Sequence, residues 1–127
     1  MTPTNDPPQQ TNMHKPQQQL ADSIRGAIEN SLDAEQVAAW IMQAVARAFG
    51  ISVDEMLGGG RRNPRRLMAA HISAAYCYRL TSLSNAEVAA MHGWADHCST
   101  NAARKRAATV EWFEDVAVAA QVKGGAL

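Results

Sequence analysis

Residues 84–108 read SNAEVAAMHGWADHCSTNAARKRAA and are the stretch that decides the expected fold. Ser84 followed three residues later by Glu87 is the capping-box pattern of a helix start, and it opens a short helix over about 85–92. Gly93 fits a tight turn, because glycine adopts backbone conformations that other residues resist. Asp96 is a good N-cap for the helix that follows. The stretch therefore predicts a helix-turn-helix at about residues 85–108.

Helical patterns also account for the rest of the chain, and no segment alternates like a strand. Apolar residues recur every four positions over about 20–31, which predicts a first helix. Further helices are expected over about 33–49, 52–57 and 64–79, and a last long helix is expected to continue from 96 past 117. The residues that mark these helices are the cap pairs Asp33–Gln36 and Ser52–Glu55, the stop Gly50, and Asn63 before Pro64. The sequence thus predicts an all-α fold.

The first nineteen residues differ in composition from the remainder. They hold four of the five prolines and five glutamines, and they contain no Leu, Ile or Val. Such a segment buries too little apolar surface to offset the entropy lost on ordering. We therefore expect a disordered Pro/Gln-rich tail over 1–19 and a single helical domain over 20–123.

The formal net charge of zero conceals an uneven distribution. Residues 58–110 carry eight Lys/Arg against two acids, a net of +6. Residues 1–57 have a net charge of −4, and residues 111–127 have a net charge of −2. A basic stretch between acidic ones favours a surface that faces a polyanion, although a solvated face without a partner has the same signature.

The sequence lacks the motifs that are typical of several classes of protein. There is no glycine-rich phosphate loop, no apolar leader and no run long enough to span a membrane, so we expect no nucleotide, no membrane association and a cytoplasmic location. Cys98 next to Ser99 lacks a positioned base, which disfavours nucleophilic catalysis. A zinc site would have to draw on His71, His92, His97, Cys77 and Cys98, which do not show the spacing of a structural site. We expect neither an enzyme nor a bound metal or cofactor.

The order of motifs along residues 36–108 is more specific than any one of them. The phrase FGISVDEML at 49–57 is followed by a basic loop, the helix start Pro64–Arg65, the pair Leu83–Ser84 and then Asp96–His97 after Gly93. This succession resembles the C-terminal DNA-binding domain of the bacterial replication initiator DnaA. The resemblance implies an all-α domain with a DnaA-like or Trp-repressor-like helix-turn-helix. The ATPase domain of that family is absent from the sequence.

The resemblance also implies roles for individual residues. Asp96, His97 and Cys98 would read base edges from the start of the second helix of the motif. Arg61, in the basic loop, would enter the adjacent minor groove. Contacts with phosphates would come from the basic loop, the following helix start and the recognition helix: Arg62, Arg65, Arg66, Ser99, Thr100, Arg104 and Lys105.

From these observations we predict a sequence-specific protein that binds double-stranded DNA, associates with the nucleoid and regulates replication or transcription. The alternative is a helical protein-interaction module with a degenerate DNA-binding face. In that case the helices within 20–49 would bind a partner protein or a second copy of the chain. Trp40 and Trp112 are expected in the core or over helix junctions, whereas Trp94 fits packing over the turn and contact with a sugar-phosphate equally well.

Overall fold

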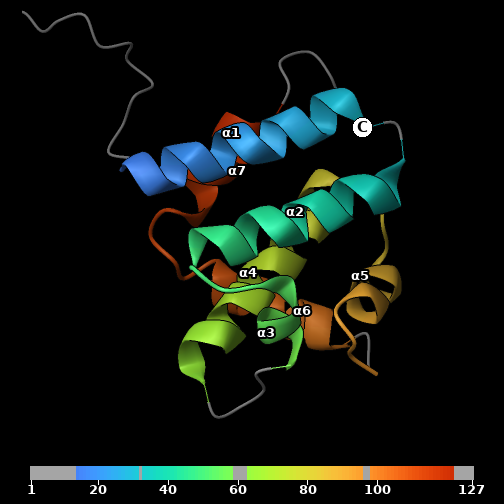
Figure 1. The fold of residues 1–127 in the computed structure, drawn as a ribbon. Helices are drawn as coiled ribbons and strands as arrows, with labels where there is room; N and C mark the ends of the chain where they lie inside the picture. The colour runs from blue at the N-terminus through green and yellow to red at the C-terminus, as the bar shows by residue number, and fades with distance from the viewer. Residues whose placement is uncertain (1–13, 32, 59–62, 96–97, 122–127) are drawn as a thin grey trace, which may run out of the picture.

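The computed structural model describes residues 14–31, 33–58, 63–95 and 98–121, and within these ranges it contains seven helices and no strand (Figure 1). The all-α prediction is confirmed. None of the helices in the described ranges is both long and apolar enough to cross a membrane. The helices are α1 (Lys15–Asn30), α2 (Ala34–Ala48), α3 (Val53–Gly58), α4 (Pro64–Leu80), α5 (Asn85–Met91), α6 (Cys98–Ala107) and α7 (Phe113–Ala120).

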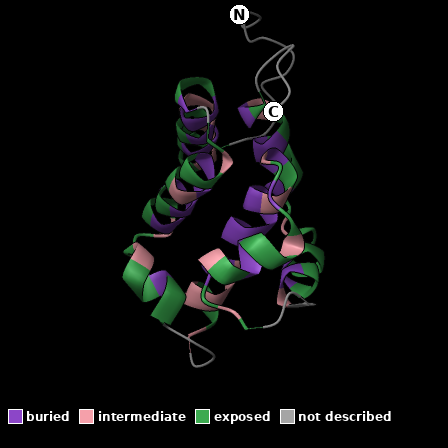
Figure 2. Ribbon diagram, turned by 90° about the vertical axis from the view of Figure 1, so that its right-hand side faces the viewer, coloured by how far each residue is buried: buried purple, intermediate pink, exposed green. Residues whose placement is uncertain are grey.

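Helix α4 is the centre of the fold and contacts α2, α3, α5, α6 and α7. Its residues 69–77 are buried on all sides of the helix apart from His71, as expected for a helix that is packed on several neighbours. Four of these residues are alanines, which let neighbouring helices approach closely. The cluster of buried apolar residues draws on all seven helices, and Figure 2 shows them on the inward sides of the helices.

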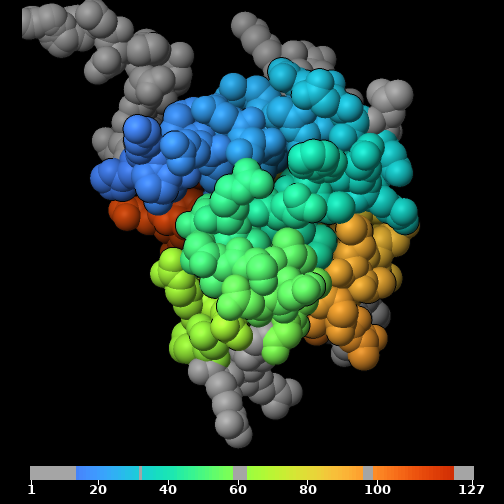
Figure 3. Space-filling model, in the orientation of Figure 1, coloured from blue at the N-terminus to red at the C-terminus, as the bar shows by residue number. Residues whose placement is uncertain are grey.

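Helices α1, α2 and α7 form one group, which α1 holds together. Helix α1 packs on α2 and on α7, and Figure 3 shows α1 and α2 side by side on one face. The guanidinium group of Arg25 on α1 donates to the carbonyl oxygen of Ala119 at the end of α7, with Nε at 3.1 Å. This contact satisfies a carbonyl that has no partner within its own helix.

Helix α1 begins five residues earlier than predicted. Residues 15–19, assigned from composition to a disordered tail, form its first turns, whereas residues 1–13 lie outside the described part of the chain. Pro16 suits a first helical turn, where its missing N–H would have no partner. The side-chain oxygen of Gln17 accepts from the backbone N–H of His14 at 3.1 Å. These local contacts favour a helix start in a segment of low hydrophobicity.

The predicted long last helix is in fact two helices. Helix α6 ends at Ala107, and the chain turns through residues 108–112 before α7 begins. Helix α6 packs on α4 while α7 packs mainly on α1, so a straight continuation would not reach both surfaces. Phe113 stacks on Tyr76 with ring centroids 4.4 Å apart, and the Tyr76 hydroxyl donates to the Phe113 carbonyl oxygen at 2.9 Å. Tertiary contacts therefore set this break.

The helix starts predicted at Asp33, Ser52 and Asn63 are confirmed with one change, whereas the N-cap predicted at Asp96 lies outside the described residues. Ser52 and Glu55 form a capping box, and the side chain of Asn63 accepts from the backbone N–H of Arg66 at the start of α4. Asp33 caps α2, but its carboxylate accepts from the N–H of Glu35 at 3.1 Å, and the reciprocal contact expected from Gln36 is not part of this cap.

Candidate nucleic-acid interface

The first element of the candidate interface is the start of α5. The Ser84 hydroxyl accepts from the N–H of Glu87 at 3.1 Å, and the Glu87 carboxylate accepts from the N–H of Ser84 at 2.8 Å. The predicted capping box is therefore present. The hydrogen bonds from the Ser84 backbone and hydroxyl lower the pKa of Glu87. Val88 and Ala89 face the core, so the short helix is fixed at its start and along its inner side.

The turn after α5 is built by the backbone. Gly93 has a φ of 76°, the left-handed region that favours glycine. Its N–H donates to the carbonyl of Ala90 at 3.1 Å, and the N–H of Trp94 donates to the carbonyl of Ala89 at 2.9 Å. This pair of bonds is a Schellman motif, which ends the helix and redirects the chain. The turn predicted at Gly93 is confirmed.

His92 anchors the turn to the core, a role that its position in the sequence does not predict. It is 1% exposed. Its Nδ1 lies 2.8 Å from the carbonyl oxygen of Val88 and must donate to it, and its Nε2 lies 2.9 Å from the hydroxyl of Ser73 on α4. A neutral ring with its proton on Nδ1 satisfies both partners, because its Nε2 then accepts from the serine hydroxyl. Burial lowers the pKa of His92, although the Val88 carbonyl acts in the opposite direction.

Trp94 packs over the turn. The sequence had allowed either this packing or a contact with a sugar-phosphate. Its ring lies edge-on to His71 of α4 with centroids 5.9 Å apart, and it lies 5.2 Å from the ring of His92. Burial lowers the pKa of His71, and the positive charge of Arg106 on α6 lowers it further. Two rings of the turn, His92 and Trp94, therefore lie together against α4, with a cation of α6 near His71.

The inner side of α6 consists of small residues. Thr100, Ala103 and Ala107 recur at i, i+3 and i+7 and are all 0% exposed. The Thr100 hydroxyl donates to the carbonyl oxygen of Asn85 at 3.0 Å, which ties the start of α6 to the start of α5. The prediction that Thr100 binds a phosphate is corrected by this burial. Its hydroxyl instead fixes the angle between the two helices.

The outer side of α6 is polar and basic. Asn101, Arg104, Lys105 and Arg106 are exposed, and the helix contains no acidic residue. The Arg104 guanidinium lies 4.1 Å from the centroid of the Tyr78 ring and donates to the Asn101 side chain at 3.1 Å. Cations in a last turn interact favourably with the helix dipole, so this arrangement also stabilises α6. Arg106 also belongs to this face, although it is not among the predicted phosphate-binding residues.

The predicted base-reading residues fall largely outside the described ranges. Asp96, His97, Arg61 and the phosphate contact Arg62 belong to segments whose structure is not described. Cys98 is the first residue of α6. Ser99 lies in the first turn of that helix and is half-buried.

Arg65 and Arg66, predicted to bind phosphates, each have an acceptor within the protein. Arg65 donates to the carbonyl oxygen of Phe49 at the end of α2, with Nη2 at 2.6 Å and Nε at 3.1 Å. Arg66 pairs with the Glu55 carboxylate at 3.1 Å. Two cations at the N-terminus of α4 oppose its dipole, and these acceptors offset that effect. A phosphate would have to use their remaining N–H groups.

Among the residues that the structure describes, the remaining thiol lies in the interior. Burial raises the pKa of the Cys77 thiol to about 12, and its sulfur lies 3.6 Å from the carbonyl oxygen of Ala38. Within the described ranges no three His, Cys, Asp or Glu side chains are placed to share a metal ion.

Comparison of the chain with protein-family models, curated proteins and solved structures gave no match.

Proposed function

We propose that the chain binds double-stranded DNA, with α5 and α6 as a helix-turn-helix and α6 as the helix that enters the major groove. The observation that carries the proposal is the division of α6 into two sides. Its inner side is buried on α4 through small residues, while its outer side presents Arg104, Lys105 and Arg106 without an acid. A helix that is packed on one side and exposed and basic on the other suits binding in a groove of DNA.

The proposed mechanism separates anchoring from reading. Lys105 and Arg106 are exposed and bind phosphates, which fixes the register of α6 on the duplex. Arg104 is held by Tyr78 and Asn101, so less side-chain entropy is lost when it meets a phosphate. The resemblance to the DnaA domain assigns base reading to Asp96, His97 and Cys98, with Arg61 in the minor groove. In this reading the protein regulates replication or transcription.

A second candidate function is a helical protein-interaction module. The observation that favours it is the engagement of Arg65 and Arg66 with acceptors of the protein itself, which leaves fewer free cations near the start of α4. In that case the basic side of α6 would be a solvated surface. The two proposals make opposite predictions for the effect of salt on binding to a duplex of mixed sequence.

The experiment is a titration of a fluorescent duplex of mixed sequence at several salt concentrations. Each phosphate contact contributes about 0.9 to the slope of log affinity against log salt, so Lys105→Ala with Arg106→Ala should reduce the slope by about two. Lys15→Ala removes an exposed lysine from the first turn of α1 and is the matched control. Absence of binding at low salt, or an equal loss in the control, would contradict the proposal.

Base reading is tested separately with duplexes selected from a random pool. If His97 contacts base edges, His97→Ala should flatten the preference at one or two positions, since a good contact is worth about 1–3 kcal/mol of discrimination. The salt slope should stay nearly unchanged. Equal weakening on selected and scrambled duplexes would show that this residue does not read sequence.

A further inference from the structure

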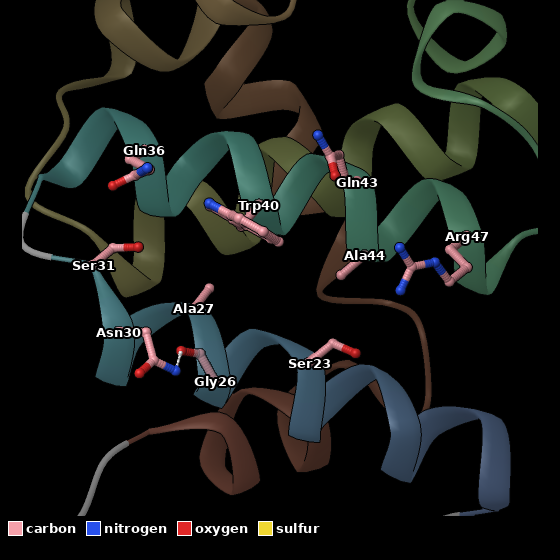
Figure 4. Close-up of a pocket in the computed structure, with 10 residues that line it drawn as sticks. All are labelled: Ser23, Gly26, Ala27, Asn30, Ser31, Gln36, Trp40, Gln43, Ala44 and Arg47. Carbon is pink, nitrogen blue, oxygen red and sulfur yellow. Dashed lines mark hydrogen bonds between the residues drawn. The ribbon is translucent and has the colours of Figure 1, made fainter.

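A tryptophan on α2 stands beside a hollow that nothing in the described chain fills. Trp40 is 52% exposed, so of the two expected positions, in the core or over a helix junction, the core is excluded. The hollow runs between α1 and α2 and has a volume of about 360 Å³. Figure 4 shows Trp40 above small residues of both helices, among them Gly26, Ala27 and Ala44. An apolar ring thus lies next to a space whose walls include several small residues.

This exposed ring is unusual for the molecule. The other large apolar side chains that are exposed in the described ranges, Leu57 and Val118, lie on α3 and α7. Tryptophan contributes a large apolar area and is enriched among the residues that dominate binding interfaces. The polar groups around the hollow are mostly uncharged, for example Asn30 and Gln43, and these can exchange hydrogen bonds with a polar partner.

The charges along α2 are complementary to those of a second copy of the same helix. Its residues in the wall of the hollow include Gln36, Trp40, Gln43 and Arg47, spaced so that they share one side of the helix. Glu35 lies in the first turn of α2 and Arg47 in the last. In the part of the chain that the structure describes, neither of these two forms an ion pair. An antiparallel copy of α2 would place each Arg47 near the acidic first turn of its partner.

We propose that the groove between α1 and α2 binds a second copy of this chain. The two α2 helices lie antiparallel, and Trp40 of each protomer enters the hollow of the other. Such a contact is isologous, because the same patch on both protomers supplies the ring and receives it. Helix α6 packs on α4 and α5, so its outer side remains uncovered in the dimer. The inference does not depend on binding to DNA.

The first test is analytical ultracentrifugation of the full chain without DNA over a wide range of concentrations. We expect a reversible monomer–dimer equilibrium. Trp40→Ala should weaken dimerisation by at least about 30-fold, the scale of losing a central aromatic anchor. Val118→Ala removes exposed apolar surface from α7 and should leave the equilibrium unchanged. Circular dichroism should report the same helix content for both variants, because each substituted side chain is largely exposed.

The second test exchanges the charges. Glu35→Lys and Arg47→Glu should each weaken the dimer, and the double variant should restore it. Each single change also opposes the dipole of α2, so an effect on folding alone would be largest in the double variant. A chain that stays monomeric at all concentrations, a dimer that Trp40→Ala leaves intact, or a double variant weaker than both singles would overturn the proposal.

Discussion

The ends of α2 and α5 use the same backbone motif and hold it in different ways. At the end of α2, Gly50 has a φ of 72°, and the N–H groups of Gly50 and Ile51 bond back to Arg47 and Ala46. At the end of α5, Gly93 and Trp94 make the equivalent bonds to Ala90 and Ala89. Both are Schellman motifs, so the local stop signal is identical in form.

The difference lies in the residue that precedes each glycine. The carbonyl of Phe49 faces outward and accepts from the exposed guanidinium of Arg65, whose carbon also lies 5.6 Å from the centroid of the Phe49 ring. His92, the corresponding residue after α5, is buried and bonds to Ser73 on the central helix. One turn is therefore held by a surface cation, and the other by a neutral side chain in the interior.

This comparison shows that a local motif ends a helix but does not determine how firmly the turn is attached. Water competes with the Arg65 contact, and salt screens it. The contacts of His92 are shielded from water, and leaving Ser73 without its partner would be costly. The turn between α5 and α6 should therefore resist salt but respond to proton concentration. The turn after α2 should show the opposite behaviour.

The largest expected effect is that of removing the buried ring. His92→Ala should lower the free energy of unfolding by about 3 kcal/mol, since it opens a cavity and leaves the Ser73 hydroxyl unpaired. Urea denaturation at pH 7.5 measures this loss. His14→Ala removes an exposed histidine at the N-cap of α1 and should lower the stability by no more than about 1 kcal/mol, the typical cost of losing a helix cap. Similar losses in the two variants would contradict the anchoring role of His92.

The second-largest expected effect is a loss of stability on acidification. This loss should be smaller than that of His92→Ala, because the protonated His92 ring keeps its volume and its hydrogen bond to Val88. Burial lowers the pKa of His92 and of His71 below the ordinary value of 6.5. The unfolded state then binds more protons, so this contribution to stability is complete above about pH 6.5 and is lost as the pH falls through the folded-state pKa values.

The pH dependence is measured by repeating the urea denaturation at intervals between pH 7.5 and pH 5. The carboxylates of Glu55, Glu87 and Glu114 have lowered pKa values, so they titrate below this window. His92→Ala should flatten the decline, and His71 should supply the remainder. A decline of unchanged steepness in His92→Ala would show that another group is responsible.

The smallest effect is expected at the other turn. Arg65→Ala removes two hydrogen bonds to one exposed carbonyl, so it should cost no more than about 1 kcal/mol. The loss should shrink in high salt, because the attraction between the guanidinium and the end of α2 is screened. Arg65→Met keeps the apolar part of the side chain over Phe49 and separates packing from charge. A loss as large as that of His92→Ala would remove the contrast between the turns.

Local chemistry explains which features could be predicted from the sequence. The capping pairs Ser52–Glu55 and Ser84–Glu87 involve residues three positions apart, so their spacing alone determines the contact. The turn at Gly93 is local for the same reason. The burial of Thr100 could also be predicted from the sequence, because this residue lies on the same helical face as Ala103 and Ala107. The resemblance to a DNA-binding domain instead implied that the Thr100 hydroxyl contacts a phosphate.

The sequence by itself determined the all-α class, most helix starts and the two glycine stops, because these depend on contacts within about four residues. Only the tertiary structure decided that α6 and α7 are separate helices, that Arg65 and Arg66 have acceptors in the protein, and that His92 is an interior anchor. Each of these depends on a partner at least eleven residues away in the sequence. The periodicity of a helix predicts the side on which a residue lies. It does not predict which residue of another helix will contact that residue.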